Sequence, residues 1–242
     1  MYRIISLVCA GIVSLCFINP AKKDTATDVL KKMYERYHTQ WHKSVTFNQV
    51  TERYRNDSLL NATTWYENMV YPDLLRIDIG KPNSPNGIIF RKDSTYQFRN
   101  SRIVRATRDE NELIFFFGGM YFLPFEKVLS HFNDLHYDLS RFHEDTWKGK
   151  PVYVLGADKD GEKTNQLWID KEKLVAVRFI KYDNNLKEEG IFENHVQVKN
   201  AWCETRCSFY FDDKLLQVET YHDIVADAPV DMKIFVPSAI GQ

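Results

Sequence analysis

The chain has 242 residues, of which 44% are hydrophobic and 14% aromatic, so it can bury a substantial core within one domain. Its 32 basic and 33 acidic side chains give a net charge of −1. A chain without a basic excess lacks the positive field that attracts nucleic acid or anionic lipid head groups, so we expect no nucleic-acid partner.

The N-terminus has the pattern of an export signal. Arg3 supplies a positive charge, and residues 4–18 are apolar except for two serines and two cysteines. Such a run suits a signal peptide and is shorter than the ~20 residues that cross a bilayer. We predict cleavage after Ala21, which separates a signal peptide, residues 1–21, from one soluble mature domain, residues 22–242. A retained membrane anchor stays open as the alternative.

Removal of the signal leaves two cysteines, Cys203 and Cys207. On a continuous strand their Cα atoms would lie ~13 Å apart, whereas a disulfide spans roughly 7 Å at most. A disulfide therefore requires a turn or bulge at residues 204–206. Export favours oxidation, so a disulfide and two free thiols both stay open. His195 and His222 show no ligand spacing to these cysteines, and we expect no metal site.

Residues 25–41 are predicted to form the first helix. Apolar side chains recur there at intervals of three and four residues and form one stripe. The stripe consists of Val29, Leu30, Met33, Tyr34 and Tyr37. Thr25 and Asp28 resemble a capping pair at the start of this helix.

From Ser44 onward the hydrophobic period changes to two, which indicates strands separated by turn residues such as Asn56-Asp57. The first group of predicted strands covers residues 45–55, 59–70, 74–79, 87–91, 95–99 and 102–106. The second group covers residues 142–147, 151–156, 166–170, 174–182, 190–198, 201–211, 215–225 and 233–236.

The clearest hairpin joins residues 166–170 to residues 174–182 through a short charged link, Lys171-Glu172-Lys173. Strict alternation along the second strand places Ala176 on one face and Phe179 on the other. Both faces are hydrophobic, so we expect this hairpin to form a wall that is covered on two sides.

The segment of residues 113–125 is the most apolar part of the chain outside the signal. Helical spacing continues after Pro124 and predicts a second helix over residues 124–135. The aromatic and apolar residues of this region either line a cavity, with Gly118-Gly119 as a hinge, or pack as an ordinary core cluster. They are Phe115, Phe116, Phe117, Met120, Tyr121, Phe122 and Phe125.

A long antiparallel meander of this kind either closes into a barrel or curls around what it must bury. The two apolar helices are the available filling for its concave face. The predicted fold is therefore mainly β with α: a curved antiparallel sheet covered by an N-terminal and a central helix.

The sequence holds no motif for catalysis or cofactor binding. A GxSxG elbow, a P-loop and a GxGxxG turn are all missing. His143 and Asp145 share one face of a predicted strand and Glu144 lies on the other, so the three cannot converge on one metal. We expect no catalytic residue, no metal and no cofactor; an envelope hydrolase remains a remote alternative.

Several segments together resemble the bacterial outer-membrane lipoprotein carrier superfamily, the LolA-like and LolB-like half-barrel proteins. They are the early strand at residues 44–52, the segment of residues 71–78 (YPDLLRID), the turn at residues 92–96 (KDSTY) and the strand pair already described. Each motif alone is degenerate, and their order along residues 24–235 carries the resemblance.

The resemblance implies an incomplete β-barrel, or half-barrel, whose apolar concave face binds acyl chains beneath a helical lid. It implies a periplasmic, monomeric, non-enzymatic carrier whose partners are lipid or lipoprotein acyl chains and envelope membrane proteins. The residues expected to form the cavity and lid are Phe115, Phe116, Phe117, Met120, Tyr121, Phe122, Phe125, Leu129, Tyr71 and Arg76.

One position departs from the family pattern. Lipoprotein-sorting carriers usually have an arginine directly before the proline of this motif, where it helps to hold the lid closed, and this chain has Tyr71. Arg76 matches a second basic position of the family. The difference leaves lipid binding open but favours a second class of function, an envelope sensor or interaction module on the same scaffold.

Overall fold

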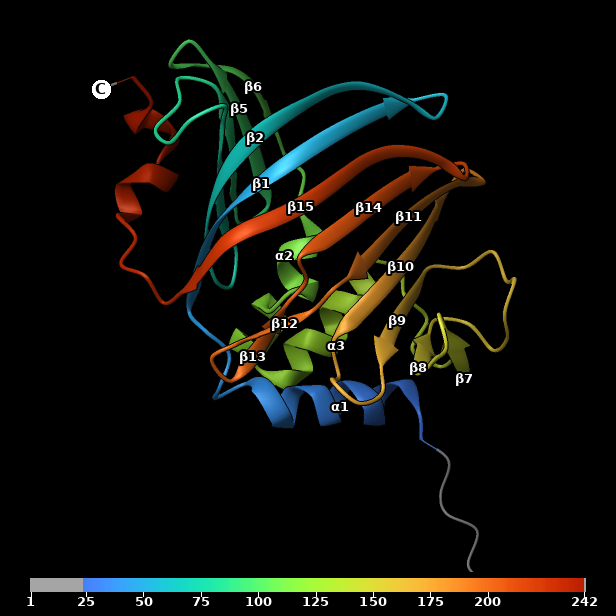
Figure 1. Ribbon diagram of the computed structural model, residues 1–242. Helices are drawn as coiled ribbons and strands as arrows, with labels where there is room; N and C mark the ends of the chain where they lie inside the picture. The colour runs from blue at the N-terminus through green and yellow to red at the C-terminus, as the bar shows by residue number, and fades with distance from the viewer. Residues whose placement is uncertain (1–23, 242) are drawn as a thin grey trace, which may run out of the picture.

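A computed structural model describes residues 24–241, and the predicted signal peptide lies outside the described residues. Thirteen antiparallel strands form one large curved sheet, which dominates the molecule (Figure 1). Two short strands form a small second sheet. The prediction of a mainly β fold with a curved antiparallel sheet is confirmed.

The first half of the large sheet contains β1 (Ser44–Arg55), β2 (Ser58–Val70), β3 (Leu74–Ile79), β4 (Gly87–Arg91), β5 (Ser94–Arg99) and β6 (Arg102–Thr107). The second half contains β7 (Phe142–Trp147), β8 (Lys150–Leu155), β9 (Gln166–Asp170), β10 (Ala176–Asp183), β11 (Leu186–Glu193), β14 (Arg206–Phe211) and β15 (Lys214–Ala226). The small sheet pairs β12 (Val196–Val198) with β13 (Ala201–Cys203).

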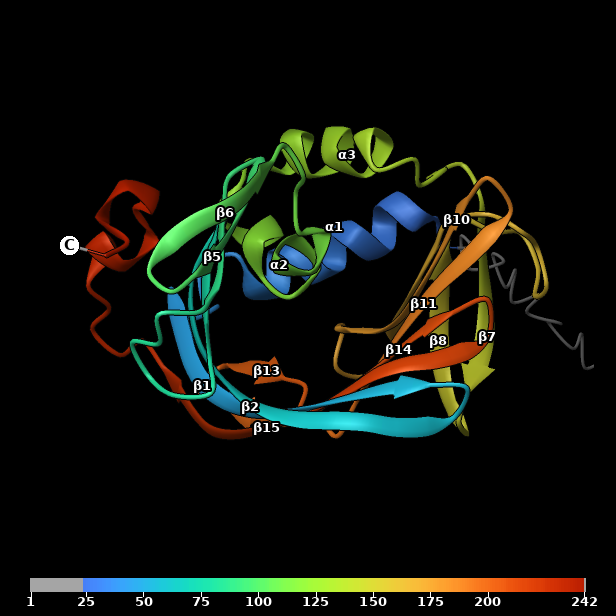
Figure 2. The same ribbon diagram turned by 90° about the horizontal axis from the view of Figure 1, so that it is seen from above.

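Nearly all neighbours in the sheet are also neighbours in sequence. The exceptions are the pair β1 and β15, which joins the two halves in the middle of the sheet, and the pair β11 and β14. β6 and β7 are the two edge strands, so the sheet does not close on itself. Figure 2 shows the resulting trough, with helices lying on its concave side.

The concave side holds α1 (Ala26–Tyr37), α2 (Glu112–Phe116), the short 3-10 helix η1 (Gly119–Phe122) and α3 (Phe125–Asp134) (Figure 2). Thr25 and Asp28 form a full capping box at the start of α1, as predicted. Val29, Leu30 and Met33 are at most 1% exposed and anchor α1 in the core. Burial of each such side chain stabilises the fold by roughly 1.5–3 kcal/mol.

The two predicted helices are confirmed, and each is shorter than expected because its ends are capping residues or turns. α2 was not predicted, because five residues are too few to show a helical period. The residues at 233–236 form a 3-10 helix, η2 (Met232–Phe235), and the prediction of a strand there is wrong. The side chain of Asp231 accepts a hydrogen bond from the Lys233 amide and turns the chain. A second 3-10 turn, η3 (Pro237–Ala239), follows.

Two long predicted strands are each divided. The segment at residues 190–198 is split between β11 and β12, and the one at residues 201–211 is split between β13 and β14. The Thr205 amide bonds the Glu193 carbonyl where the second break occurs. Each break lets the chain leave the large sheet and build the small one on its concave side (Figure 2).

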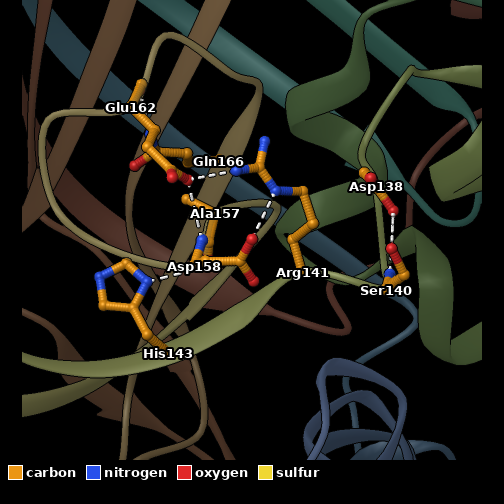
Figure 3. A network of polar contacts seen from close by, with 8 residues as sticks. All are labelled: Asp138, Ser140, Arg141, His143, Ala157, Asp158, Glu162 and Gln166. Carbon is orange, nitrogen blue, oxygen red and sulfur yellow. Dashed lines mark hydrogen bonds and ion pairs between the residues drawn. The ribbon is translucent and has the colours of Figure 1, made fainter.

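The loop after β8, at residues 156–165, is held by a polar network (Figure 3). Arg141 bonds Asp158 at 3.0 Å and Glu162 at 2.6 Å. Glu162 also accepts a bond from the Asp158 amide, and its carbonyl accepts one from Gln166. The loop is therefore a fixed part of the wall. Across residues 24–241, no helix is long and apolar enough to cross a membrane.

Candidate functional site

A cavity of about 80 Å³ lies on the concave face of the sheet, beneath α2. Its walls come from alternate residues of neighbouring strands, because only every second side chain of a strand faces inward. β1 contributes Val45 and Phe47, β2 contributes Trp65, Glu67 and Met69, and β3 contributes Leu75 and Ile77. The remaining lining residues are Tyr71, Asn111, Leu113, Ile114, Phe117, Trp202, Cys203, Glu204, Phe209, Glu219 and Tyr221.

α2 separates this cavity from a second one of about 200 Å³. Asn111 and Ile114 line both, and Phe115 lines the second. Asn111 also caps α2 by accepting a hydrogen bond from the Leu113 amide. A displacement of this short helix would therefore join the two spaces.

The segment that follows α2 packs closely against its surroundings. Gly118 has φ +145°, and a Cβ at that position would lie 2.1 Å from Nε1 of Trp41. A Cβ at Gly119 would lie 2.5 Å from the carbonyl oxygen of Pro72. Only glycine fits this path without strain. This is the pair that the sequence analysis treats as a hinge.

Tyr71 fastens the same segment to the sheet. Its hydroxyl donates a 2.8 Å hydrogen bond to the Phe117 carbonyl, and its ring stacks on Phe122 with 5.6 Å between centroids. Burial raises the pKa of this phenol, so the hydroxyl keeps its proton and stays a donor. Tyr71 thus lines the cavity and holds the covering segment closed.

Arg76 lies on the outer face of β3 and is not among the residues that line the cavity. It bonds Asp78 at 2.8 Å and the Ile234 carbonyl at 3.0 Å, which ties η2 to the sheet. Strand parity explains the placement, because Leu75 and Ile77 on either side of it face inward. The structure therefore gives Arg76 an architectural contact outside the cavity.

The other predicted residues divide into two groups. Phe117 lines the 80 Å³ cavity, while Phe116 and Tyr121 line a small neighbouring gap beside Trp41. Met120 is fully buried in the hydrophobic core, and three half-buried side chains of the helical cover pack against this core. These three are Phe122, Phe125 and Leu129. The aromatic cluster is thus mainly packed core, with one edge open to the cavity.

Three acidic residues of the cavity are absent from the sequence-based prediction. Glu67, Glu204 and Glu219 are 6%, 7% and 8% exposed. Burial raises the pKa of all three, and that of Glu204 reaches about 8. Repulsion by neighbouring carboxylates adds to the increase for Glu67 and Glu204. The parity of residues 65, 67 and 69 places Glu67 between two inward apolar side chains, which is the signal that could have revealed it.

Cys203 and Cys207 are free thiols, both buried. The chain does break between them, at residues 204–205, as a disulfide would require. Cys207 instead donates a bond to the Tyr221 hydroxyl at 3.3 Å. Burial raises the pKa of both thiols well above the ordinary value, so they remain protonated and unreactive.

No group of three His, Cys, Asp or Glu side chains in the described part of the chain is arranged to hold a metal ion. His143 contacts the Ala157 carbonyl through Nδ1 at 2.9 Å (Figure 3). Its ring also lies against the Trp168 ring in an edge-to-face arrangement. The histidine therefore helps to position the loop at residues 156–165.

No protein-family model and no curated protein matches the chain by sequence. Solved structures match it by shape. A DUF1329 family protein from Desulfovibrio piger has a TM-score of 0.62 at 13% identity, over 89% of this chain and 97% of that chain. A LolA superfamily protein from Nitrosomonas europaea has a TM-score of 0.58 at 15% identity, over 88% and 98%.

A third solved structure is a putative outer membrane lipoprotein-sorting protein domain from Vibrio parahaemolyticus. Its TM-score is 0.58 at 12% identity, and the match covers 88% of this chain and 97% of that chain. At such identities the likeness concerns the fold. This chain has the fold of LolA superfamily proteins, a curved antiparallel sheet left open on one side with helices on its concave face.

Proposed function

We propose that the protein is an exported, non-enzymatic periplasmic carrier that binds the acyl chains of lipids or lipoproteins on the concave face of its sheet. The observation that supports this function is the largely apolar cavity beneath a short, separately packed helix. Each methylene buried there would contribute about 0.8 kcal/mol. The lipoprotein-sorting name of one structural neighbour agrees with this class of cargo.

Loading requires the cover to move. A cavity of about 80 Å³ has room for a few water molecules, at about 30 Å³ each, and not for an acyl chain. Leu113, in α2, and Phe117, directly after it, line the cavity on the side of the cover. We expect cargo to displace residues 111–123 and to occupy both cavities that α2 now separates.

A thermal melt tests the proposal. Delipidated protein mixed with a diacylated lipopeptide should melt at a higher temperature than protein alone, because the ligand binds only the folded state. The variant Leu113→Trp fills the cavity and should reduce this rise. The control Leu186→Trp changes an exposed leucine at the start of β11, beside the β10–β11 turn, and should leave the rise unchanged. If no acyl amphiphile raises the melting temperature, the carrier proposal fails.

A second candidate, an interaction module, is favoured by one surface. Leu59, Leu60 and Leu216 are 53%, 53% and 46% exposed near the tips of the β1–β2 and β14–β15 hairpins. Leu60 and Leu216 border a groove of about 490 Å³ beside these tips, which lie close together in Figure 1. Native mass spectrometry of protein taken from the exporting cell separates the two functions. A lipid mass supports the carrier, and a stable protein partner without lipid supports the module.

A further inference from the structure

The cavity that is proposed to hold acyl chains contains an acidic cluster. Glu67 comes from β2, Glu219 comes from β15, and Glu204 lies where β13 gives way to β14. All three line the cavity, and each is more than nine-tenths buried. A site built only for hydrocarbon would have apolar side chains at these positions, since burying an ionisable group without a partner is costly.

The hydrogen-bond donors of the cluster are unevenly distributed, because they reach Glu219 and not the side chains of Glu67 and Glu204. Glu219 accepts bonds from Gln217 at 2.6 Å and from the Tyr221 hydroxyl at 2.9 Å, and the side chain of Gln49 is a third partner. The Glu67 side chain has no hydrogen-bond or ion-pair partner within residues 24–241. The carboxylate of Glu204 has only its own backbone amide. No lysine, arginine or histidine is among the residues that line this cavity.

The other titratable groups that face the cluster are all acidic when they ionise. They are Tyr71, Tyr221, Cys203 and Cys207, and burial raises the pKa of each. The whole surrounding therefore offers neutral or negative groups and no fixed positive charge. A ligand that brings donors and a positive charge would satisfy the cluster, whereas an anionic head group would be repelled.

We propose that Glu67, Glu204 and Glu219 form a head-group subsite that binds the amine of an amphiphile, with its hydrocarbon chain against Val45, Trp65 and Ile77. This inference rests on the proposed acyl-chain cavity and specifies its cargo. A primary ammonium carries three donors and one positive charge, which suits unsatisfied carboxylates. The two sources of such a group are a long-chain lipid amine and the free N-terminal amine of a lipopeptide.

Titration calorimetry on delipidated protein tests the inference with matched probes: dodecylamine, dodecanol and dodecanoate. At about pH 7 the amine is charged. We expect dodecylamine to bind at least about tenfold more tightly than dodecanol, and dodecanoate to bind more weakly than dodecanol. Binding of the amine should also release protons from the cluster, detected as a dependence of the heat on the buffer, and dodecanol should release none.

Variants test whether the glutamates cause the preference for dodecylamine over dodecanol. Glu67→Gln and Glu204→Gln keep the shape of each side chain and should each reduce the preference for dodecylamine over dodecanol to within about threefold. Glu52→Gln is the matched control, because Glu52 lies on the outer face of the neighbouring strand β1. A lipopeptide with a free N-terminal amine and its N-acetylated form then distinguish the two sources of the amine.

Each outcome has a distinct meaning. If dodecylamine and dodecanol bind the wild-type protein equally well, or if dodecanoate binds most tightly, the amine subsite is overturned while the acyl-chain cavity stands. If none of the three probes binds, the proposed carrier function itself fails. The wild-type comparison needs no variant, so the inference stays testable even if a glutamine variant does not fold.

Discussion

At the scale of single residues, Glu204 links the stability of the protein to pH. Its carboxyl group is buried, and its pKa rises from 4.5 to about 8. Between those values the folded state holds a proton that the unfolded state has lost, so this group's contribution to stability falls as pH rises through about 8. His42 and His195 act in the opposite sense at lower pH, since burial lowers the pKa of each to about 4.

We therefore predict that Glu204→Gln changes the pH profile of stability. The variant should gain stability relative to the wild type between about pH 5 and pH 8, by at most about 1.4 kcal/mol for each pH unit. Urea unfolding at several pH values measures this difference. Glu52→Gln should run parallel to the wild type. A constant offset between Glu204→Gln and the wild type would show that folding does not shift the pKa of Glu204.

The residues that could be predicted from sequence were those with local partners. The capping box of Thr25 and Asp28 spans one helical turn, and its geometry follows from spacing. The acidic cluster could not be predicted in the same way. Glu67 and Glu219 are 152 positions apart in sequence. They approach each other because β2 and β15 both pair with β1 in the sheet. Arg76 was expected at the ligand site, and the parity of β3 places it on the outer face.

At the scale of elements, α2 and η1 are the shortest helices of the cover, with five and four residues. α2 has one turn's length, and its next residue, Phe117, is held by the hydroxyl of Tyr71. Gly118 then carries the chain past Trp41 in a conformation that other residues rarely adopt. This segment owes its place to contacts at its two ends rather than to helical stability of its own.

We predict that Gly118→Ala loosens this cover. The added methyl group would meet the Trp41 indole and would be strained at a φ of +145°, which should lower the free energy of unfolding by roughly 1–3 kcal/mol. Gly161→Ala is the control, because Gly161 also has a positive φ, of +77°, but has open space around its Cβ direction. Equal losses in urea unfolding for the two variants would mean that Trp41 does not hold the segment.

Most elements could be located from hydrophobic periodicity, but the face of the sheet on which each side chain lies could not always be predicted. In β10, strict alternation separates Ala176 from Phe179, yet both are buried in the main core. A register shift between Ala176 and Arg178 turns the strand over, and Val177 packs with Trp168 on the opposite face. Such a bulge depends on pairing with β9, which the local sequence does not encode.

At the scale of the whole molecule, the sheet remains open because helices occupy its interior. β6 and β7 end the sheet without pairing to each other, and α1, α2 and α3 lie across the concave side between them (Figure 2). The strand pattern and the two apolar helices predicted a curved sheet with a helical cover, and the open half-barrel was implied by the resemblance to the lipoprotein carriers. The cavity could not be predicted, since it depends on how far α2 sits from strands that are distant in sequence.

Hydrogen exchange can test the proposed displacement of the cover, because the sheet and the cover are held by different contacts. β1 pairs along its length with β2 and β15 at the centre of the sheet, so its amides should exchange slowly with or without ligand. Residues 113–123 depend on contacts such as the bond from Tyr71 to the Phe117 carbonyl, which an acyl chain beneath α2 would break.

We predict that adding dodecylamine to delipidated protein speeds exchange in residues 113–123 and leaves β1 and β2 unchanged. Dodecanol at saturation should do the same, because displacement follows from the chain and not from the head group. Uniform protection of residues 113–123 by both ligands would instead show that the cover closes over its cargo without moving aside.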